Sequence, residues 1–248
     1  MDSSTVIELS ARLRRARRLT VVTGAGVSAA SGVPTFRGPS GLWRSFRPED
    51  LATPEAFGRN PRLVWEWYDW RRSLIAACLP NPAHEVLARW SHRDGFTLIT
   101  QNVDGLHERA GTRGVVRFHG SIWELRCAPG CRNDSWEDRT VPLAELPPRC
   151  PRCGGLARPG VVWFGESIDP RVLARSEAAL DCDVMLSVGT SSVVYPAAGL
   201  VQAARARGAF VAEINPATTD VAGELDLAIA APAEEALPRL DALVNGMV

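Results

Sequence analysis

The sequence predicts an α/β protein in which helices cover both faces of a parallel sheet. Short apolar runs rich in β-branched residues alternate with helix-length segments, and this alternation is typical of buried parallel strands. The length of 248 residues, with 46% hydrophobic and 23% charged residues, is enough for one large domain or two smaller ones. The predicted strands, in chain order, are residues 19–23, 96–100, 115–118, 161–164, 184–188, 210–214 and 225–229.

The N-terminal segment predicts an amphipathic helix. Val6, Leu9, Leu13 and Ala16 recur at helical spacing, and the nearby arginines fall mostly on the opposite face, although a transit peptide or an anion patch is the alternative. Acidic residues precede these arginines, the reverse of a secretory leader, and no apolar run approaches the ~20 residues that cross a bilayer. We therefore expect a cytoplasmic protein without a membrane partner.

Two segments interrupt the alternating pattern. Residues 37–82 are rich in aromatic side chains and predict helices with an apolar cluster of their own. The stretch from Cys127 to Cys153 is rich in proline, cysteine and charge, which predicts a small inserted module.

The composition excludes several function classes. The 28 basic residues balance the 28 acidic ones, so we expect no specific or general nucleic-acid partner. All 28 basic residues are arginine. Because lysine is absent, Schiff-base catalysis and P-loop phosphoryl transfer are excluded.

Four of the 6 cysteines form two close pairs with 18 residues between the pairs. This spacing suits a tetrahedral zinc ion, and four sulfur ligands leave no open position, so the metal is expected to be structural. Reduced free thiols or two disulfides are the alternatives. Cys78 and Cys182 lie outside the pattern and are expected to be small core residues. The predicted ligands are Cys127, Cys131, Cys150 and Cys153.

A glycine-rich turn follows the first predicted strand. Gly24, Gly26 and Ala29 form a G-x-G-x-x-A pattern, in which backbone amides at a helix start can approach a pyrophosphate. Plain packing is the alternative. A hydride-transferring enzyme would carry an acidic ribose reader about 20 residues later. Here Glu49 and Asp50 follow a proline rather than a strand, so hydride transfer is not favoured.

Three other predicted strands also end in polar residues. Gln101 and Asn102 follow one strand, residues 189–192 (GTSS) follow a second, and Asn215 follows a third. Each could serve as a turn or cap, but together they predict one site around a polar ligand at the edge of the sheet. His119 is expected at the same edge, which favours it as a general base over the chain's three other histidines.

These motifs, taken together, resemble the sirtuins, a family of NAD-dependent protein lysine deacylases. The resemblance rests on residues 24–37 (GAGVSAASGVPTFR), 101–104 (QNVD), 118–120 (FHG), the four cysteines and residues 189–191 (GTS). It implies a single catalytic unit over residues 1–248. A Rossmann-like NAD-binding domain would comprise residues 1–36, 83–122 and 158–248, and a small domain would combine a helical module, residues 37–82, with a zinc module, residues 123–157.

The resemblance also implies an activity. NAD would be consumed as a co-substrate, and the acyl group of protein lysine would be released as O-acyl-ADP-ribose together with nicotinamide. His119 would act as the base and Asn102 as its catalytic neighbour, while Phe36 would shield the reactive centre from water. The residues expected to bind NAD are Gly24, Ala25, Gly26, Ser28, Phe36, Arg37, Trp43, Gln101, Asn102, Asp104, Gly189, Thr190, Ser191, Asn215 and Ala233.

The same resemblance predicts how the acylated peptide binds. The peptide would add a strand between residues 162–166 and 192–194, with contacts to Val162, Phe164 and Gly165. Tyr68 and Arg71 share a helix face and resemble the Tyr-x-x-Arg pair of the subgroup that removes succinyl and malonyl groups, with acetyl also expected as a substrate. A core aromatic stripe is the alternative interpretation of that pair.

Other function classes share parts of this pattern. A nicotinamide oxidoreductase would share the glycine turn, and a non-enzymatic zinc adaptor would share the cysteines. A mono-ADP-ribosyltransferase or a plain deacetylase on the same scaffold is the nearest enzymatic alternative. We expect NAD and one structural zinc ion as ligands, acyl-lysine proteins or peptides as partners, and a monomer.

Overall fold

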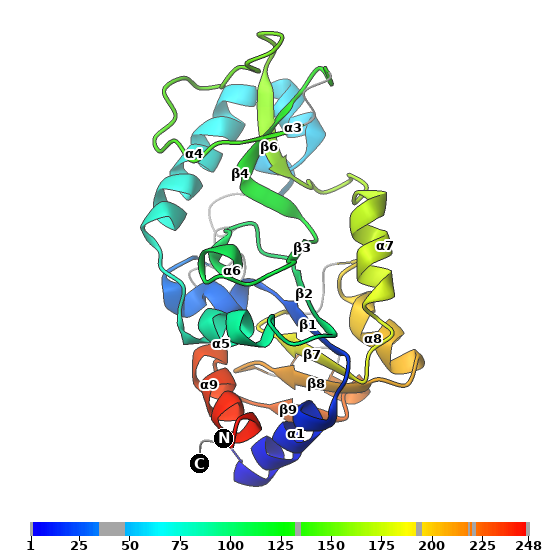
Figure 1. Ribbon diagram of the computed structural model, residues 1–248. Helices are drawn as coiled ribbons and strands as arrows, with labels where there is room; N and C mark the ends of the chain where they lie inside the picture. The colour runs from blue at the N-terminus through cyan, green and yellow to red at the C-terminus, as the bar shows by residue number, and fades with distance from the viewer. Residues whose placement is uncertain are drawn as a thin grey trace.

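The computed structural model describes residues 2–34, 48–131, 135–191, 195–217, 219 and 222–246. A six-stranded sheet with the order β3-β2-β1-β7-β8-β9 forms its larger part, and every neighbouring pair in it is parallel (Figure 1). This confirms the predicted α/β class. The strands are β1 (Leu19–Thr23), β2 (Phe96–Thr100), β3 (Val116–Arg117), β7 (Val184–Val188), β8 (Phe210–Ile214) and β9 (Leu227–Ile229).

Helices cover both faces of this sheet. One face packs against α1 (Ser3–Arg15), α5 (Pro82–Trp90) and α9 (Ala233–Val244), and α9 contacts both of the other helices. The other face packs against α7 (Pro170–Ala178) and α8 (Gly199–Ala206). The predicted first helix is confirmed, because its apolar stripe is buried in the first of these two cores. The stripe consists of Val6, Leu9, Leu13 and the cap residue Ala16.

A second, three-stranded antiparallel sheet lies beyond the C-terminal end of the large sheet (Figure 1). Its strands are β4 (Gly120–Cys127), β5 (Trp136–Glu137) and β6 (Ala157–Val161). It packs against α2 (Pro48–Leu51), α3 (Pro54–Arg59) and α4 (Pro61–Ala77) in an aromatic-rich core. The described part of residues 37–82 is thus mainly helical, as predicted, but its apolar cluster is shared with the small sheet rather than its own.

The predicted strand at residues 161–164 is wrong. Val161 is the last residue of β6 and belongs to the small antiparallel sheet, whereas the next three residues form no strand. Their backbone N–H groups donate to scattered acceptors: Val162 to His119 O, Trp163 to the Glu166 carboxylate and Phe164 to Ala52 O. The apolar run is therefore a connection between the two parts, in which Trp163 is buried and Phe164 is exposed.

Local signals explain where the site-bearing helices begin. The Asn60 side chain caps α4 by accepting from Leu63 N, and a proline occupies the first turn, where a missing N–H costs nothing. The glycine turn after β1 forms a 3-10 helix, η1 (Ala25–Ser31), which ends at Gly32 in the left-handed region, φ +88°. The remaining short helices are α6 (Leu106–Arg109) and η3 (Ala222–Glu224).

The two sheets form a large and a small part, and the strands of the small sheet cross the predicted domain boundaries. β4 begins before the expected boundary at residue 123, and β6 ends after the one at residue 157. We propose the same division into a large and a small part, with both of these strands in the small part. Within the described ranges, none of the helices combines the length and apolar character that a membrane crossing requires.

Candidate active site

A cavity of about 810 Å³ opens where the strands of the large sheet end and the small part begins. Strand exits supply one wall, and α4 with the segment after β6 supplies the other. The structure therefore gathers most of the predicted site residues in one place. Those that line the cavity are Gly24, Ala25, Gly26, Tyr68, Arg71, Gln101, Asn102, His119, Val162, Phe164, Gly165, Gly189, Thr190, Ser191 and Asn215.

Some predicted residues lie elsewhere. Ser28 and Asp104 are buried outside the cavity lining, where Ser28 contacts the lining residue Asn102 and Asp104 contacts Ser28. The side chain of Ala233 is packed in the core at the start of α9 and does not line the cavity. Phe36, Arg37, Trp43 and the predicted peptide-binding residues 192–194 fall outside the described residues.

The two glycines of the turn after β1 pack directly against the turn after β7. Gly26 N donates to Gly189 O at 2.8 Å, and a Cβ atom on Gly26 would lie 2.7 Å from Gly189 Cα. A Cβ atom on Gly24 would lie 2.8 Å from Thr190 Cα. Real Cβ atoms do not approach so closely, so packing requires both glycines. The same turn lines the cavity, which leaves its backbone close to any ligand there.

Asn102 links the glycine turn to a buried polar network. Its Nδ2 donates to Gly24 O at 3.0 Å and to Ser28 Oγ at 3.1 Å. Ser28 Oγ in turn donates to Asp104 Oδ2 at 2.8 Å, and burial raises the pKa of Asp104 despite this bond. Because both Asn102 donor hydrogens are engaged, its Oδ1 is the atom available to a ligand donor. The network fixes the amide at the cavity wall.

His119 lies at the cavity wall, in agreement with its predicted place at the sheet edge. Its Nδ1 is 3.2 Å from the carbonyl oxygen of Gln101, so Nδ1 carries the hydrogen and Nε2 is the basic atom. Burial lowers the pKa of His119 below its ordinary value, while the bond to Gln101 opposes that shift. The imidazole is therefore neutral and able to accept a proton at physiological pH.

The other histidines have structural environments. His84 and His107 are fully buried with ring centroids 4.8 Å apart, and burial lowers the pKa of each to about 3. His84 also accepts from Asn81 N in the cap of α5. His92 is exposed. Among the four, His119 alone lines the cavity.

Tyr68 and Arg71 project from α4 into the opposite wall, and both side chains are buried. The Arg71 guanidinium carbon lies 4.8 Å from the Trp67 ring centroid and 5.8 Å from that of Tyr68, within the range of cation–π attraction. Burial raises the pKa of Tyr68, while the charge of Arg71 opposes this, so the phenol keeps its proton. One cation and one neutral hydroxyl thus face the cavity from one helix.

Sequence reasoning missed three aromatic residues of the cavity wall: Trp67, Trp163 and Tyr195. Trp67 stood in the segment assigned to an aromatic cluster, and Trp163 lay within the segment 162–166 predicted to bind the peptide, but neither was named as a site residue. Tyr195 is 70% exposed, which is unusual for a large aromatic side chain. The available signal was for Tyr195, which comes shortly after the polar residues that follow the predicted strand at 184–188.

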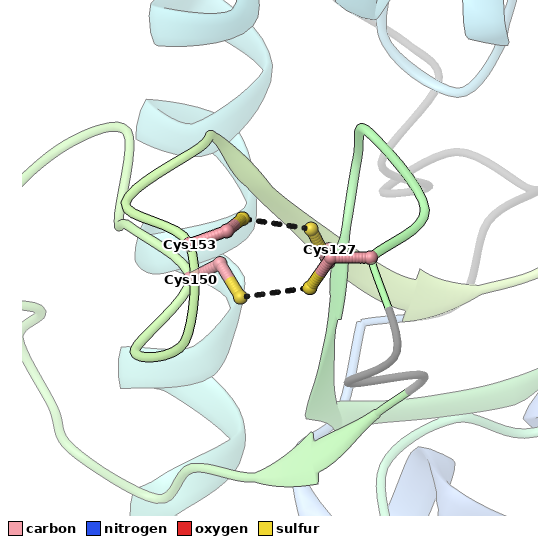
Figure 2. A group of neighbouring side chains, drawn as sticks. Cys127, Cys150 and Cys153 are labelled. Atoms are coloured by element: carbon pink, nitrogen blue, oxygen red, sulfur yellow. Dashed lines mark hydrogen bonds between the residues drawn. The ribbon is translucent and has the colours of Figure 1, made fainter.

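The four predicted metal ligands lie together at the end of the small sheet. Their sulfur atoms are all within 4.8 Å of one another, and Figure 2 shows Cys150 and Cys153 facing Cys127. The Cys127–Cys153 and Cys131–Cys150 sulfur atoms are 3.5 and 3.6 Å apart. Disulfide sulfur atoms would be about 2.05 Å apart, whereas thiolates about 2.3 Å from a tetrahedral zinc ion are nearly 3.8 Å apart. The donor set and its spacing fit one structural zinc ion.

The fold and site together define an α/β enzyme with a cavity between a parallel sheet and a small zinc-binding part. The Sir2 family model matches residues 24–196, and the chain belongs to the Sir2 family, the sirtuins. An NAD-dependent protein deacylase of Aquifex aeolicus is 54% identical over 211 residues, covering 84% of this chain and 87% of that protein. NAD-dependent protein deacylase 1 of Pseudomonas aeruginosa is 48% identical, covering 95% and 96%.

Solved structures agree with this assignment. A Sir2 homologue in complex with NAD superposes with a TM-score of 0.90 at 43% identity, covering 97% of this chain and 94% of that chain. A Sir2 homologue mutant in complex with ADP-ribose superposes with a TM-score of 0.93 at 42% identity, covering 100% and 98%.

Proposed function

We propose that this protein removes acyl groups from protein lysine with consumption of NAD, and that it prefers acyl groups that end in a carboxylate. The products are nicotinamide, the free lysine and O-acyl-ADP-ribose. Relatives named NAD-dependent protein deacylase support the general activity. So do Sir2 structures solved with 2'-O-acetyl-ADP-ribose and with a myristoylated histone peptide.

The observation that carries the acyl preference is the burial of Tyr68 and Arg71 at the wall that faces His119. Succinyl and malonyl groups have a distal carboxylate, which a guanidinium and a phenol can bind with charge-assisted hydrogen bonds. An acetyl group has no such carboxylate and gains nothing from the pair. Acetyl-lysine still fits the same cavity as a smaller substrate.

The remaining cavity residues have separate roles in binding NAD and in proton transfer. Gln101 and Asn102 lie beside the glycine turn and orient the ribose and nicotinamide of NAD. His119 Nε2 accepts the proton of the ribose hydroxyl that completes acyl transfer, because Nδ1 is held by Gln101 O. The turns carrying Gly26 and Gly189 place their backbone against the phosphates.

The acylated peptide binds along the segment that follows β6. Val162, Phe164 and Gly165 line the cavity there, Gly165 has φ +83°, and Phe164 is 46% exposed at the rim. A peptide added as a strand would be recognised through its backbone more than through its sequence. The expected partners are therefore acyl-lysine proteins of varied sequence.

The decisive experiment is mass spectrometry of the products formed from NAD and matched acetyl-, succinyl- and malonyl-lysine peptides. We expect one nicotinamide and one O-acyl-ADP-ribose for each acyl group removed, with the succinyl peptide turned over most efficiently. ADP-ribosylated peptide without deacylation would favour the transferase instead. Equal or greater efficiency on the acetyl peptide would favour a plain deacetylase.

The cytoplasmic location and the monomeric state remain predictions from the sequence. Fractionation of the cells that produce the protein tests the first. Sedimentation of the purified chain tests the second.

A further inference from the structure

Trp163 is joined to Tyr68 by a hydrogen bond inside the small part. Trp163 Nε1 donates to the Tyr68 hydroxyl oxygen at 3.0 Å, and the two side chains are 3% and 2% exposed. Both residues line the cavity. The bond thus connects the segment that follows β6 to the helix that carries the predicted acyl-recognition pair.

The chemistry of the two groups fixes the direction of this bond. An indole N–H is a donor only, so the Tyr68 oxygen must be the acceptor. The phenol hydrogen is then left for another acceptor, and no hydrogen bond from it to any described residue is present. Since Tyr68 lines the cavity, that hydrogen is available to a ligand.

The indole itself is held in place from several sides. The Arg158 guanidinium carbon lies 3.6 Å from the Trp163 ring centroid, and the Phe57 ring centroid lies 5.3 Å from it. Glu166 binds Arg158 and also accepts from Trp163 N at 2.8 Å. These contacts restrict the ring, so its N–H stays directed at Tyr68.

We infer that Trp163 is a positioning residue for acyl specificity: it makes the Tyr68 hydroxyl a donor toward the distal carboxylate of the acyl group. This inference rests on the proposed carboxylate preference and deepens it. A carboxylate can only accept hydrogen bonds, so it benefits from a hydroxyl oriented as a donor. The methyl group of acetyl-lysine makes no such bond, so Trp163 contributes to the ratio of the two activities.

Trp163→Phe tests the inference, because phenylalanine keeps an aromatic ring between Arg158 and Phe57 but lacks the N–H. The expected result is a fall of about 3- to 10-fold in the succinyl-to-acetyl ratio of kcat/KM, the range of one neutral hydrogen bond. Where this variant folds poorly, β-(3-benzothienyl)alanine at position 163 keeps the bicyclic shape, lacks the N–H and should lower the ratio equally.

Two further variants separate positioning from general damage. Trp90 lies in the core of the large part, where its Nε1 donates to Asp241 Oδ1 at 2.7 Å, so Trp90→Phe loses an indole hydrogen bond away from Tyr68 and should lower stability but leave the ratio in place. In a Tyr68→Phe background no hydroxyl remains to be oriented. Trp163→Phe should then cause no further fall in the ratio.

A spectroscopic measurement follows the hydrogen bond without turnover. The chain has 2 tyrosines, so ¹³C labelling at the tyrosine Cζ gives two resonances, which Tyr195→Phe assigns. Trp163→Phe should shift the Tyr68 resonance, and Trp90→Phe, in the other core, should not.

The outcomes separate this inference from the proposed function. A wild-type enzyme that does not prefer the succinyl peptide overturns the carboxylate preference and this inference with it. A wild-type preference that Trp163→Phe leaves unaltered, or lowers equally in the Tyr68→Phe background, overturns the inference alone. An unshifted Tyr68 resonance in Trp163→Phe also overturns it.

Discussion

His119 Nδ1 and the Gln101 carbonyl oxygen are 3.2 Å apart, and this contact fixes the chemistry of the imidazole. It leaves Nε2 as the basic atom, while burial lowers the pKa of the ring and keeps it neutral at physiological pH. Gln101 itself lines the cavity and donates from Nε2 to Thr190 Oγ1 at 3.0 Å. Gln101 thereby orients His119 through its backbone carbonyl. Its side chain links the segment after β2 to the segment after β7.

His119→Ala should lower deacylation by ~10²-fold or more, because general-base catalysis contributes on that scale. NAD binding and the unfolding midpoint should change little, since His119 is at a cavity wall rather than in a core cluster. Steady-state turnover and calorimetric NAD titration measure the two effects. His92→Ala, on the exposed surface, is the control. Retention of wild-type turnover by His119→Ala would make the residue structural.

Acid should destabilise the protein through His84 and His107. Both are buried as neutral rings, and burial lowers the pKa of each from 6.5 to about 3. Between pH 6.5 and pH 3 the unfolded chain binds protons at these two histidines and the folded chain does not. Their contribution to the free energy of unfolding is therefore fully present above pH 6.5 and is lost as the pH decreases. Linkage gives a loss of about 2 kcal/mol for each histidine between pH 7 and pH 5.

The variant His107→Gln isolates this contribution. Glutamine does not titrate, so the stability difference between pH 7 and pH 5 should be about 2 kcal/mol smaller than in the wild type. Urea unfolding followed by tryptophan fluorescence measures it. Acid also affects both proteins through metal loss and through Asp104 and Glu213, whose pKa values burial raises and which therefore favour the folded state at low pH. These effects are common to the variant and the wild type, so they cancel when the two are compared. An identical pH dependence in both proteins would rule the explanation out.

One zinc ion per chain should be found in the purified protein. Cys150→Ser should lose the metal and lower the melting temperature, because the cluster closes the end of the small sheet and metal affinity contributes to folding. Elemental analysis and calorimetry test this. Cys182→Ser, at a buried cysteine outside the cluster, should keep the metal. A fully zinc-loaded Cys150→Ser protein would contradict the assignment.

The large sheet could be predicted closely because its strands are buried on both faces. Residues 19–23, 96–100, 184–188 and 210–214 match β1, β2, β7 and β8 in full. A continuous apolar run bounded by polar turn residues marks both ends of a buried strand, so the bounds of these strands can be predicted from the sequence. The polar residues after these strands could be predicted as a site for the same reason, since parallel strands end at a common edge.

The small sheet could not be predicted in the same way. β4 is only partly buried on one face, with Glu124 and Arg126 between buried Trp123, Leu125 and Cys127, and its partner strand is distant in sequence. The run at residues 161–164 is apolar for a different reason, since Trp163 packs into the small core. The Trp163–Tyr68 bond joins residues 95 positions apart, and no local pattern encodes such a pairing.

The acyl preference makes the sharpest prediction, and it depends on Arg71. Arg71 is 5% exposed and lines the cavity, so removing its guanidinium leaves the distal carboxylate of a bound succinyl group without its cation. Arg71→Met keeps the apolar stem and should lower succinyl activity by ~2 to 4 kcal/mol in transition-state terms, with acetyl activity affected far less. Tyr68→Phe should act in the same direction by about 1 kcal/mol, because it removes one neutral hydrogen bond.

The quantity to measure is the ratio of kcat/KM for succinyl over acetyl peptides in the wild type and in both variants. Arg62→Met is the matched control, since Arg62 is exposed on the same helix and pairs with Glu66 at 2.9 Å. It removes the same charge from α4 without approaching the cavity, so the ratio should be retained. If Arg71→Met also retains the ratio, Tyr68 and Arg71 belong to the aromatic core, and their placement at the cavity wall has no bearing on which acyl group is removed.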